Sequence, residues 1–188
     1  MPSTYAHYIF GQQIHRQLTG YERKVVDKYQ ELFNIGLHGP DILFYYKPLR
    51  RNKVNRLGNK IHDESGRKFF VHAAKVLHTH EQYEGYLAYV YGVICHFALD
   101  ETCHGYVEQA VKEIGLAHIA VEGELDRELM IMNGVDPVRR RMTEHIVPSM
   151  KNAAIIKEFY HGITAKEVQE ALSGMIFFDR LFVCPLKL

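Results

Sequence analysis

The stretch YGVICHFALDETCHGY, residues 91–106, places His96, Asp100 and His104 at strict intervals of four residues. Four residues turn an α-helix by about 400°, so these three side chains share one face of a helix. The flanking residues, among them Val93 and Phe97, are apolar. A carboxylate buried without a partner among such residues is strongly destabilising, and a cation is the simplest partner for it. The stretch therefore predicts a central, buried helix that carries a metal site.

A second pair, His118 and Glu122, has the same spacing on the next expected helix. A histidine and a carboxylate one turn apart can hold one zinc ion from a single helix face. By itself this pair is weak evidence, because a chain with 12 His and 22 acidic residues produces such spacings by chance. The stripe from His96 to His104 is about 12 Å long, which is too long for one ion. We therefore expect two neighbouring ions, with Asp100 between them.

The composition limits the class of protein. The 188 residues are 47% hydrophobic, which argues for a folded domain with a sizeable core. Lys and Arg number 23 against 22 Asp and Glu, so no broad positive field favours nucleic acid or an anionic membrane. Three Cys without a C-x-x-C spacing indicate neither a disulfide framework nor a zinc ribbon. We see no secretory signal and no apolar run long enough to span a membrane, and we expect a cytoplasmic protein.

Helical periodicity runs through most of the chain, and no segment alternates like a strand. The sequence predicts one all-α, metal-binding catalytic domain over residues 1–188. The segment 41–60 is expected to be mostly loop, because it contains Pro48, Asn52, Asn55 and Gly58. The apolar end, FFDRLFVCPLKL, indicates either a truncated or a docked C-terminus. The expected helices cover residues 5–18, 21–36, 63–80, 82–115, 117–134, 136–147, 150–162 and 164–182.

Several motifs carry a family resemblance. HFALDETCH is followed by HIAVE, and TYAHYIFG, GLHGPDILFYY and LGNKIHDES precede them. In this order they resemble the zinc-dependent phospholipase C family of bacteria, whose relatives include the catalytic domain of clostridial alpha-toxin and the fungal single-strand nucleases. The resemblance covers most of the chain. It implies an all-helical phospholipase C/nuclease fold around a cluster of two or three zinc ions.

The resemblance also implies a set of ligands. One zinc would be held by four residues: Asp41, His62, His96 and Asp100. A second would be held by His104, His118 and Glu122. Asp100 would bridge the first zinc to a third, on which His7 is the other side-chain ligand. His38 and His72 are second choices for Asp41 and His62. Secreted relatives add the amino group of their mature N-terminus to the third site, and here excision of Met1 would free the amine of Pro2.

The resemblance implies a zinc-dependent phosphodiesterase in which a zinc-activated water attacks the phosphorus atom and Asp41 acts as general base. We expect a small-molecule or lipid phosphoester as substrate and no stable binding of nucleic acid; the oligomeric state is left open. Phe44, Tyr45 and Tyr46 are candidates either for substrate contact or for core packing.

Three alternatives stay open. The first is a nuclease or phosphomonoesterase on the same scaffold. The second is a non-catalytic helical protein that a metal stabilises. The third is a phosphohydrolase of another helical family that uses an adjacent His-Asp pair, which His62 and Asp63 would supply.

Overall fold

The structure is a computed structural model that describes residues 4–182. Every regular element in this range is a helix, so the all-α prediction is confirmed. Two of the elements, η1 and η2, are 3-10 helices. In chain order the elements are α1 (Thr4–Gln17), α2 (Gly20–Lys28), α3 (Gln30–Gly36), η1 (Gly39–Tyr45), α4 (Lys53–Asp63), α5 (Gly66–Thr79), α6 (Glu84–Ile114), α7 (His118–Met132), α8 (Met150–Ile156), η2 (Lys157–Phe159) and α9 (Ala165–Phe182).

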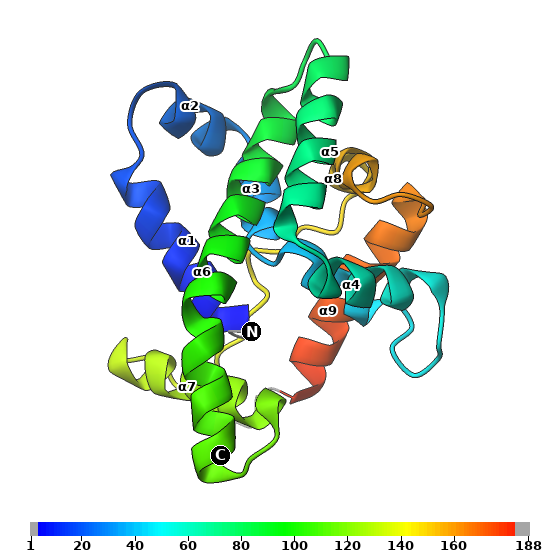
Figure 1. Cartoon of the computed structure of the whole chain (residues 1–188). Coiled ribbons are helices and arrows are strands. Elements are labelled where there is room, and N and C mark those ends of the chain that lie inside the picture. Colours follow the sequence, from blue (N-terminus) through cyan, green and yellow to red (C-terminus); the bar gives the residue numbers. More distant parts are fainter. Residues whose placement is uncertain (1–3, 183–188) are drawn as a thin grey trace.

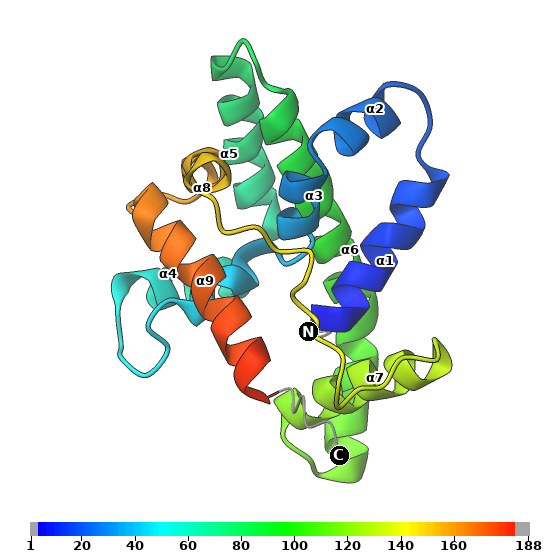
Figure 2. The ribbon, with the colours of Figure 1, turned by 180° about the vertical axis from the view of Figure 1, so that it is seen from behind.

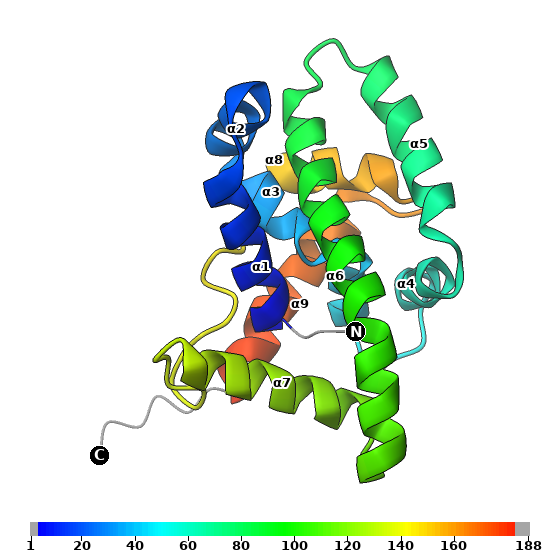
Figure 3. The ribbon, with the colours of Figure 1, turned by 60° about the vertical axis from the view of Figure 1, so that its left-hand side comes forward.

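Helix α6 is the axis of the molecule (Figure 1). Its 31 residues span about 46 Å at 1.5 Å per residue. The first half is buried among α1, α3 and α5, whereas the second half extends past them, with α7 lying across it (Figure 3). The helix ends at Gly115, as the sequence predicts. His96 and Asp100 lie where the buried half gives way to the exposed half.

The closest helix contact in the core is between α3 and α6, where the two backbones cross without intervening side chains. A Cβ added to Gly92 would lie 2.2 Å from the carbonyl oxygen of Phe33, and one added to Gly36 would lie 2.3 Å from that of Tyr89. Real Cβ atoms do not approach so closely, so both positions require glycine. The crossing fixes the end of α3, and with it the start of η1, against the middle of α6.

The remaining core lies on the other side of α3, where α8 and α9 pack together (Figure 2). Tyr89 of α6 and Tyr160 are both buried there, and their hydroxyl oxygens are 2.7 Å apart in a hydrogen bond. Helix α9 begins with the capping box that the sequence predicts. Thr164 Oγ1 accepts a hydrogen bond from the backbone N–H of Glu167, and the Glu167 carboxylate accepts one from that of Thr164.

The expectation that residues 41–60 are mostly loop was wrong, because residues 41–45 belong to η1 and Lys53–Asp63 forms α4. Asn52 is the N-cap: its side-chain oxygen accepts hydrogen bonds from Val54 N (2.9 Å) and Asn55 N (3.0 Å). The Asn55 side chain in turn donates to the carbonyl oxygens of Leu43 and Tyr46 in and beside η1. Asn52 thus caps α4, and Asn55 joins α4 to η1 through hydrogen bonds.

The helix predicted over residues 136–147 is absent, and turns take its place. The buried carboxylate of Asp179 in α9 accepts hydrogen bonds from Met142 N (3.2 Å) and Thr143 N (3.3 Å), and Thr143 Oγ1 donates to it at 2.7 Å. These bonds hold the segment in a non-helical conformation. The predicted helix over 21–36 is divided at Tyr29 into α2 and α3.

No helix within residues 4–182 is long and apolar enough to cross a membrane. Two predictions concern parts of the chain outside the described residues. They are the proposed amine of Pro2 and the apolar C-terminal end, which includes Cys184.

Candidate metal centre

Five of the eight predicted ligands lie together where α1, η1, α4 and α6 meet. His7 comes from the first turns of α1, Asp41 from η1 and His62 from the last turn of α4, and His96 and Asp100 lie on α6. His7 and His96 are 2% and 1% exposed, respectively. Their rings stack with centroids 4.4 Å apart. Two imidazoles are thereby enclosed at the centre of the fold.

Asp100 lies between the two buried histidines. Its Oδ1 is 3.2 Å from Nε2 of His7, and its Oδ2 is 3.2 Å from Nε2 of His96. One oxygen of the carboxylate therefore faces each ring. This is the arrangement of a carboxylate that bridges two positive centres, which is the role the sequence predicts for Asp100.

His62 and Asp41 form the second half of the cluster. Nδ1 of His62 is 2.8 Å from the carbonyl oxygen of Gly58, which only accepts, so Nδ1 carries the proton. In the neutral ring Nε2 then has a lone pair, and it lies 2.7 Å from Asp41 Oδ1. Two acceptors at this distance require a proton or a metal ion between them. The Gly58 carbonyl therefore orients His62 as second-shell acceptors orient metal-bound histidines.

The donor set fits a divalent cation. Ligand atoms of His7, Asp41 and His96 all lie within 4.8 Å of one another, and so do those of His62, His96 and Asp100. In the described part of the chain, both ring nitrogens of His7, Nδ1 of His96 and Oδ1 of Asp100 are buried without a hydrogen-bond partner. Each such group costs about 1–3 kcal/mol. Imidazole and carboxylate are also the ligands that zinc prefers beside thiolate.

The electrostatics favour metal-binding protonation states at His96 and Asp41. At His62, burial would lower the pKa, but the hydrogen bond with Asp41 and the charge of Asp41 raise it, so an ion there would replace a proton. Burial and the neighbouring His7 lower the pKa of His96 to about 4, so its ring is neutral at neutral pH. Burial would raise the pKa of Asp41, but the neighbouring imidazoles of His96 and His62 outweigh this effect and lower the pKa below its ordinary value. A neutral imidazole thus lies beside an ionised carboxylate.

Gly39 brings Asp41 close to His96. It has a φ of +46°, and a Cβ at this position would lie 2.4 Å from Cδ2 of the His96 ring. Any other residue would strain the backbone and displace the imidazole. The motif GLHGPD therefore requires glycine before Pro40 so that η1 can lie directly against the cluster.

Asp126 is a residue of this region that the sequence reasoning missed. It is buried on α7, and its carboxylate accepts hydrogen bonds from the first turn of α1, at Tyr5 N (2.8 Å) and Ala6 N (2.9 Å). A carboxylate at a helix N-terminus satisfies free N–H groups and interacts favourably with the helix dipole. The spacing could have revealed it, because Asp126 follows Glu122 by four residues, as Glu122 follows His118. Asp126 fixes the turn that precedes His7.

The other three predicted ligands lie farther along α6 and on α7. Nε2 of His118 is 2.8 Å from Oε1 of Glu122, as their spacing suggests. His104 faces Glu108 at 3.0 Å instead, and the ring centroids of His104 and His118 are 6.2 Å apart. Within the described residues, His104, His118 and Glu122 do not form a group whose ligand atoms all lie within 4.8 Å of one another. These three residues therefore lie near each other, but their ligand atoms do not converge on one point.

The second-choice histidines lie outside the cluster. His38 is buried with its Nε2 2.7 Å from Nε2 of His145, and it belongs to neither group of close ligand atoms among the described residues. His72 donates from Nε2 to the carbonyl oxygen of Glu158 at 2.9 Å. Asp63 is exposed, and His62 pairs with the distant Asp41 rather than with this neighbour.

A cleft of about 620 Å³ leads from the solvent to the cluster. Four of the predicted ligands line it: His62, His96, Asp100 and His104. Phe44 and Phe97 contribute aromatic walls, whereas Tyr46 is buried in the core. A ligand in the cleft can therefore reach the cluster directly.

A comparison with known families supports the sequence motifs. The family model described as zinc dependent phospholipase C matches residues 6–172, which include all eight predicted ligands. Searches of curated proteins and of solved structures gave no match. The matched range begins in α1 and ends in α9, so it contains every element of the cluster. The chain belongs to the zinc-dependent phospholipase C family.

Proposed function

We propose that the protein hydrolyses phosphodiesters with zinc bound by His7, Asp41, His62, His96 and Asp100. The proposal depends on the cluster itself, in which ring nitrogens of His7 and His96 and Oδ1 of Asp100 are buried without hydrogen-bond partners, beside an open cleft. Membership in the family supports a metal-dependent hydrolase of phospholipase C type. The phosphodiester specificity and the ligand roles are part of the proposal.

Bound zinc would lower the pKa of a water molecule towards neutrality and neutralise charge on the phosphoryl group. Asp100 is proposed to bridge two ions, because its two oxygens face different histidines. Asp41 is proposed to orient the attacking water and accept its proton. The ionised state of Asp41 at neutral pH supports this role, since an acceptor must begin the reaction without the proton. The Gly58 carbonyl holds His62 in the matching tautomer.

The charge of the cleft supports a lipid or other small phosphodiester as substrate. Asp63, Glu64 and Glu101 line it, and none of the described lining residues is Lys or Arg. With zinc bound, the centre itself attracts any phosphate, but the described lining offers no Lys or Arg for the further phosphates of a nucleic acid, whose binding depends on neutralising cations. The lining attracts a zwitterionic phosphodiester with a cationic head group, which Phe44 and Phe97 can also contact through cation–π interactions.

We propose that His104, His118 and Glu122 hold a further zinc ion, which gives two or three ions in total. The His118–Glu122 pair at 2.8 Å supports this proposal. His104 would have to turn from Glu108 towards His118 when the ion binds. Its side chain is 55% exposed, so such a rotation displaces no core packing.

Elemental analysis of zinc-loaded protein, combined with a panel of substrates, tests the proposal. The panel contains p-nitrophenyl phosphorylcholine, bis-p-nitrophenyl phosphate, p-nitrophenyl phosphate and single-stranded DNA. We expect at least two equivalents of zinc, fastest turnover of the phosphorylcholine diester, and loss of turnover on chelation with recovery on adding zinc.

The same panel separates the alternatives. Hydrolysis of the monoester alone would show that the proposed reaction type is wrong, and fastest cleavage of DNA would favour a nuclease. Full zinc occupancy without hydrolysis of any substrate in the panel would indicate that the metal only stabilises the fold.

A further inference from the structure

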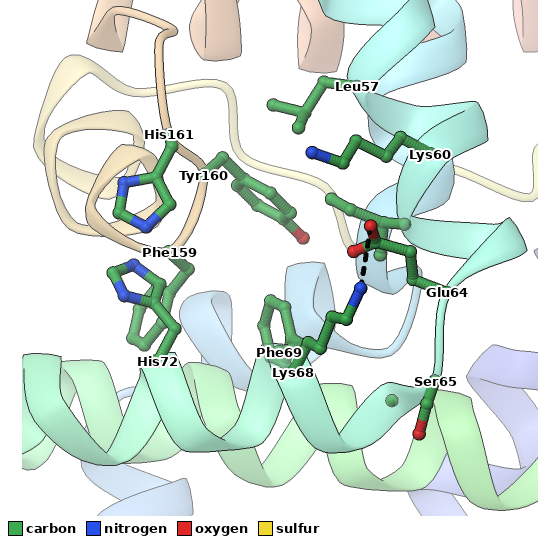
Figure 4. A pocket seen from close by; sticks show the side chains of 12 residues that line it. Leu57, Lys60, Glu64, Ser65, Lys68, Phe69, His72, Phe159, Tyr160 and His161 are labelled. Carbon is green, nitrogen blue, oxygen red and sulfur yellow. Dashed lines mark ion pairs between the residues drawn. The ribbon is translucent and has the colours of Figure 1, made fainter.

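A second cavity lies on the far side of the turn between α4 and α5. It has a volume of about 200 Å³. Figure 4 shows it enclosed by α4, by α5 and by the segment that contains Phe159, Tyr160 and His161. None of the five clustered metal ligands lines it. Its lining shares only Glu64, Ser65 and Gly66 with the metal cleft. The cavity is thus a separate site that borders the cleft.

Most of the inner surface of the cavity is apolar, and the imidazoles of His72 and His161 lie on one side of it (Figure 4). Phe69 and Phe159 are buried with their rings 6.2 Å apart, and Tyr160 is buried beside them. Leu57 and Ile61 of α4 form the opposite wall. The one polar group of Tyr160 is already bonded to Tyr89, so the ring presents its apolar body. These surfaces suit a hydrocarbon group.

The mouth of the cavity carries positive charge. Lys68 is paired with Glu64 at 3.1 Å, so those two charges compensate each other. Lys60 extends across the opening from α4 (Figure 4). In the described part of the chain, its ammonium group has no carboxylate within ion-pair distance. One uncompensated cation therefore stands above an apolar cavity.

From this combination we infer that the cavity binds a single-chain anionic amphiphile of medium length, such as a fatty acid, with its tail among Leu57, Phe69 and Phe159 and its head group at Lys60. Pockets for drug-sized ligands have volumes of about 300–1,000 Å³. A cavity of about 200 Å³ is smaller, so it accepts one short chain and excludes the paired chains of a diacyl lipid. This site is additional to the proposed phosphodiesterase site and requires no metal.

Fluorescence of 1-anilinonaphthalene-8-sulfonate, an anionic apolar dye, tests the inference by competition. The competitors are octanoate, octanol and octylammonium, which have the same chain and different head groups. We expect octanoate to displace the dye at about five-fold lower concentration than octanol, since a partly exposed ion pair contributes up to about 1 kcal/mol. Octylammonium should compete least. Equal competition by all three compounds would show that the charge of the head group does not contribute to binding, and the assignment of Lys60 would be wrong.

Two variants locate the site. Lys60→Met should abolish the preference for octanoate over octanol. The matched control, Lys166→Met, removes an exposed lysine of α9 that lines no described cavity, and it should preserve the preference. Leu57→Trp should fill the cavity and reduce dye binding at least ten-fold, provided that circular dichroism shows a native helix content. If Lys60→Met retains the preference, the head-group assignment is wrong, whether or not Leu57→Trp folds.

Asp100→Asn separates this inference from the proposed function. It should lower zinc content and leave displacement of the dye by octanoate unchanged. Loss of dye displacement in Asp100→Asn, or in zinc-free wild-type protein, would contradict the inference that the cavity binds its ligand independently of the metal centre. Failure of the wild-type protein to hydrolyse any phosphodiester would overturn the proposed function and leave the dye result intact.

Discussion

The carboxylate of Asp126 on α7 accepts a hydrogen bond of 2.8 Å from the backbone N–H of Tyr5 on α1, 121 positions earlier in the chain. The adjacent N–H of Ala6 donates to the other oxygen of the same carboxylate. Helix α7 also carries His118 and Glu122, whereas α1 carries His7. One buried carboxylate therefore ties together the helices that supply ligands to different proposed zinc positions.

Asp126→Asn should destabilise the protein by about 1–3 kcal/mol, because the buried acceptor loses its charge, a hydrogen bond from the first turn of α1 and its interaction with the helix dipole. Urea denaturation of the metal-free protein measures this difference. The affinity for zinc should also fall, since His7 lies on the next turn of α1. The control is Asp136→Asn, which alters an exposed turn where Asp136 Oδ1 accepts from Val138 N. Equal effects of the two changes would contradict the linking role of Asp126.

Asp100→Asn should reduce zinc content and lower turnover of a phosphodiester by at least about 100-fold, because changes in the second shell of metal sites already cost 10–100-fold. Asp63→Asn is the matched control, since Asp63 is exposed and adjacent to His62 but not in the cluster. It should retain zinc. If Asp63→Asn loses zinc and Asp100→Asn retains it, the ligand assignment is wrong and the adjacent His-Asp alternative gains support.

Gly39→Ala should destabilise the fold by at least about 2 kcal/mol, through strain at positive φ and the clash with the His96 ring. Zinc affinity measured by competition with a chelator should fall with it. Gly123→Ala on α7 is the comparison, because nothing lies within 4 Å of the added Cβ and the position is helical. The Gly123→Ala variant should be more stable than the wild type by about 0.5–1 kcal/mol. If Gly39→Ala changed neither the stability nor the zinc affinity, the position of η1 would not depend on this close approach.

Glu167 provides a stability prediction that depends on pH. Burial would raise the pKa of Glu167, but the hydrogen bonds from Thr164 and the contact with Lys53 at 3.1 Å lower it below its ordinary value of 4.5. A group with a lowered folded-state pKa stabilises the protein above its unfolded pKa, and this contribution disappears as the pH falls through the folded value. Glu167→Gln should therefore cost about 0.5–1 kcal/mol at pH 7 and less at about pH 3, since the contribution decreases as the pH falls below 4.5. Thermal unfolding at both values measures the difference, and a pH-independent cost would exclude the ionic contribution.

The sequence predicted the features that depend on spacing within one helix. His96, Asp100 and the apolar residues between them belong to a single α6, and Thr164 and Glu167 form the expected capping box. These patterns are local, because residues three or four apart on a helix are neighbours wherever that helix lies. The convergence of His7, Asp41 and His62 on α6 came from the family resemblance, since nothing in the spacing of separate elements fixes how they pack.

The errors arose where a distant residue decides the local structure. Asn52 and Asn55 indicate loop by composition, yet they cap α4 and bridge it to η1. The segment beginning at Asp136 has a good helix start. However, the backbone N–H of Thr143 in this segment donates to the carboxylate of Asp179, 36 residues later, and not to a carbonyl oxygen within a helix. Tertiary hydrogen bonds of this kind override local propensity and leave no periodic signal.

The backbone crossing at Gly36 and Gly92 bears on which ion the protein can accept. The backbones of α3 and α6 are in direct contact at these glycines, and η1 follows α3. A change of side-chain rotamer therefore cannot widen the distance between η1 and α6. A rigid frame favours a small ion bound at about 2.0–2.2 Å, as zinc is by nitrogen and carboxylate oxygen, and penalises calcium, which needs 2.3–2.6 Å and more ligands. Discrimination by ionic radius would then originate in two residues that have no side chains and do not touch the metal.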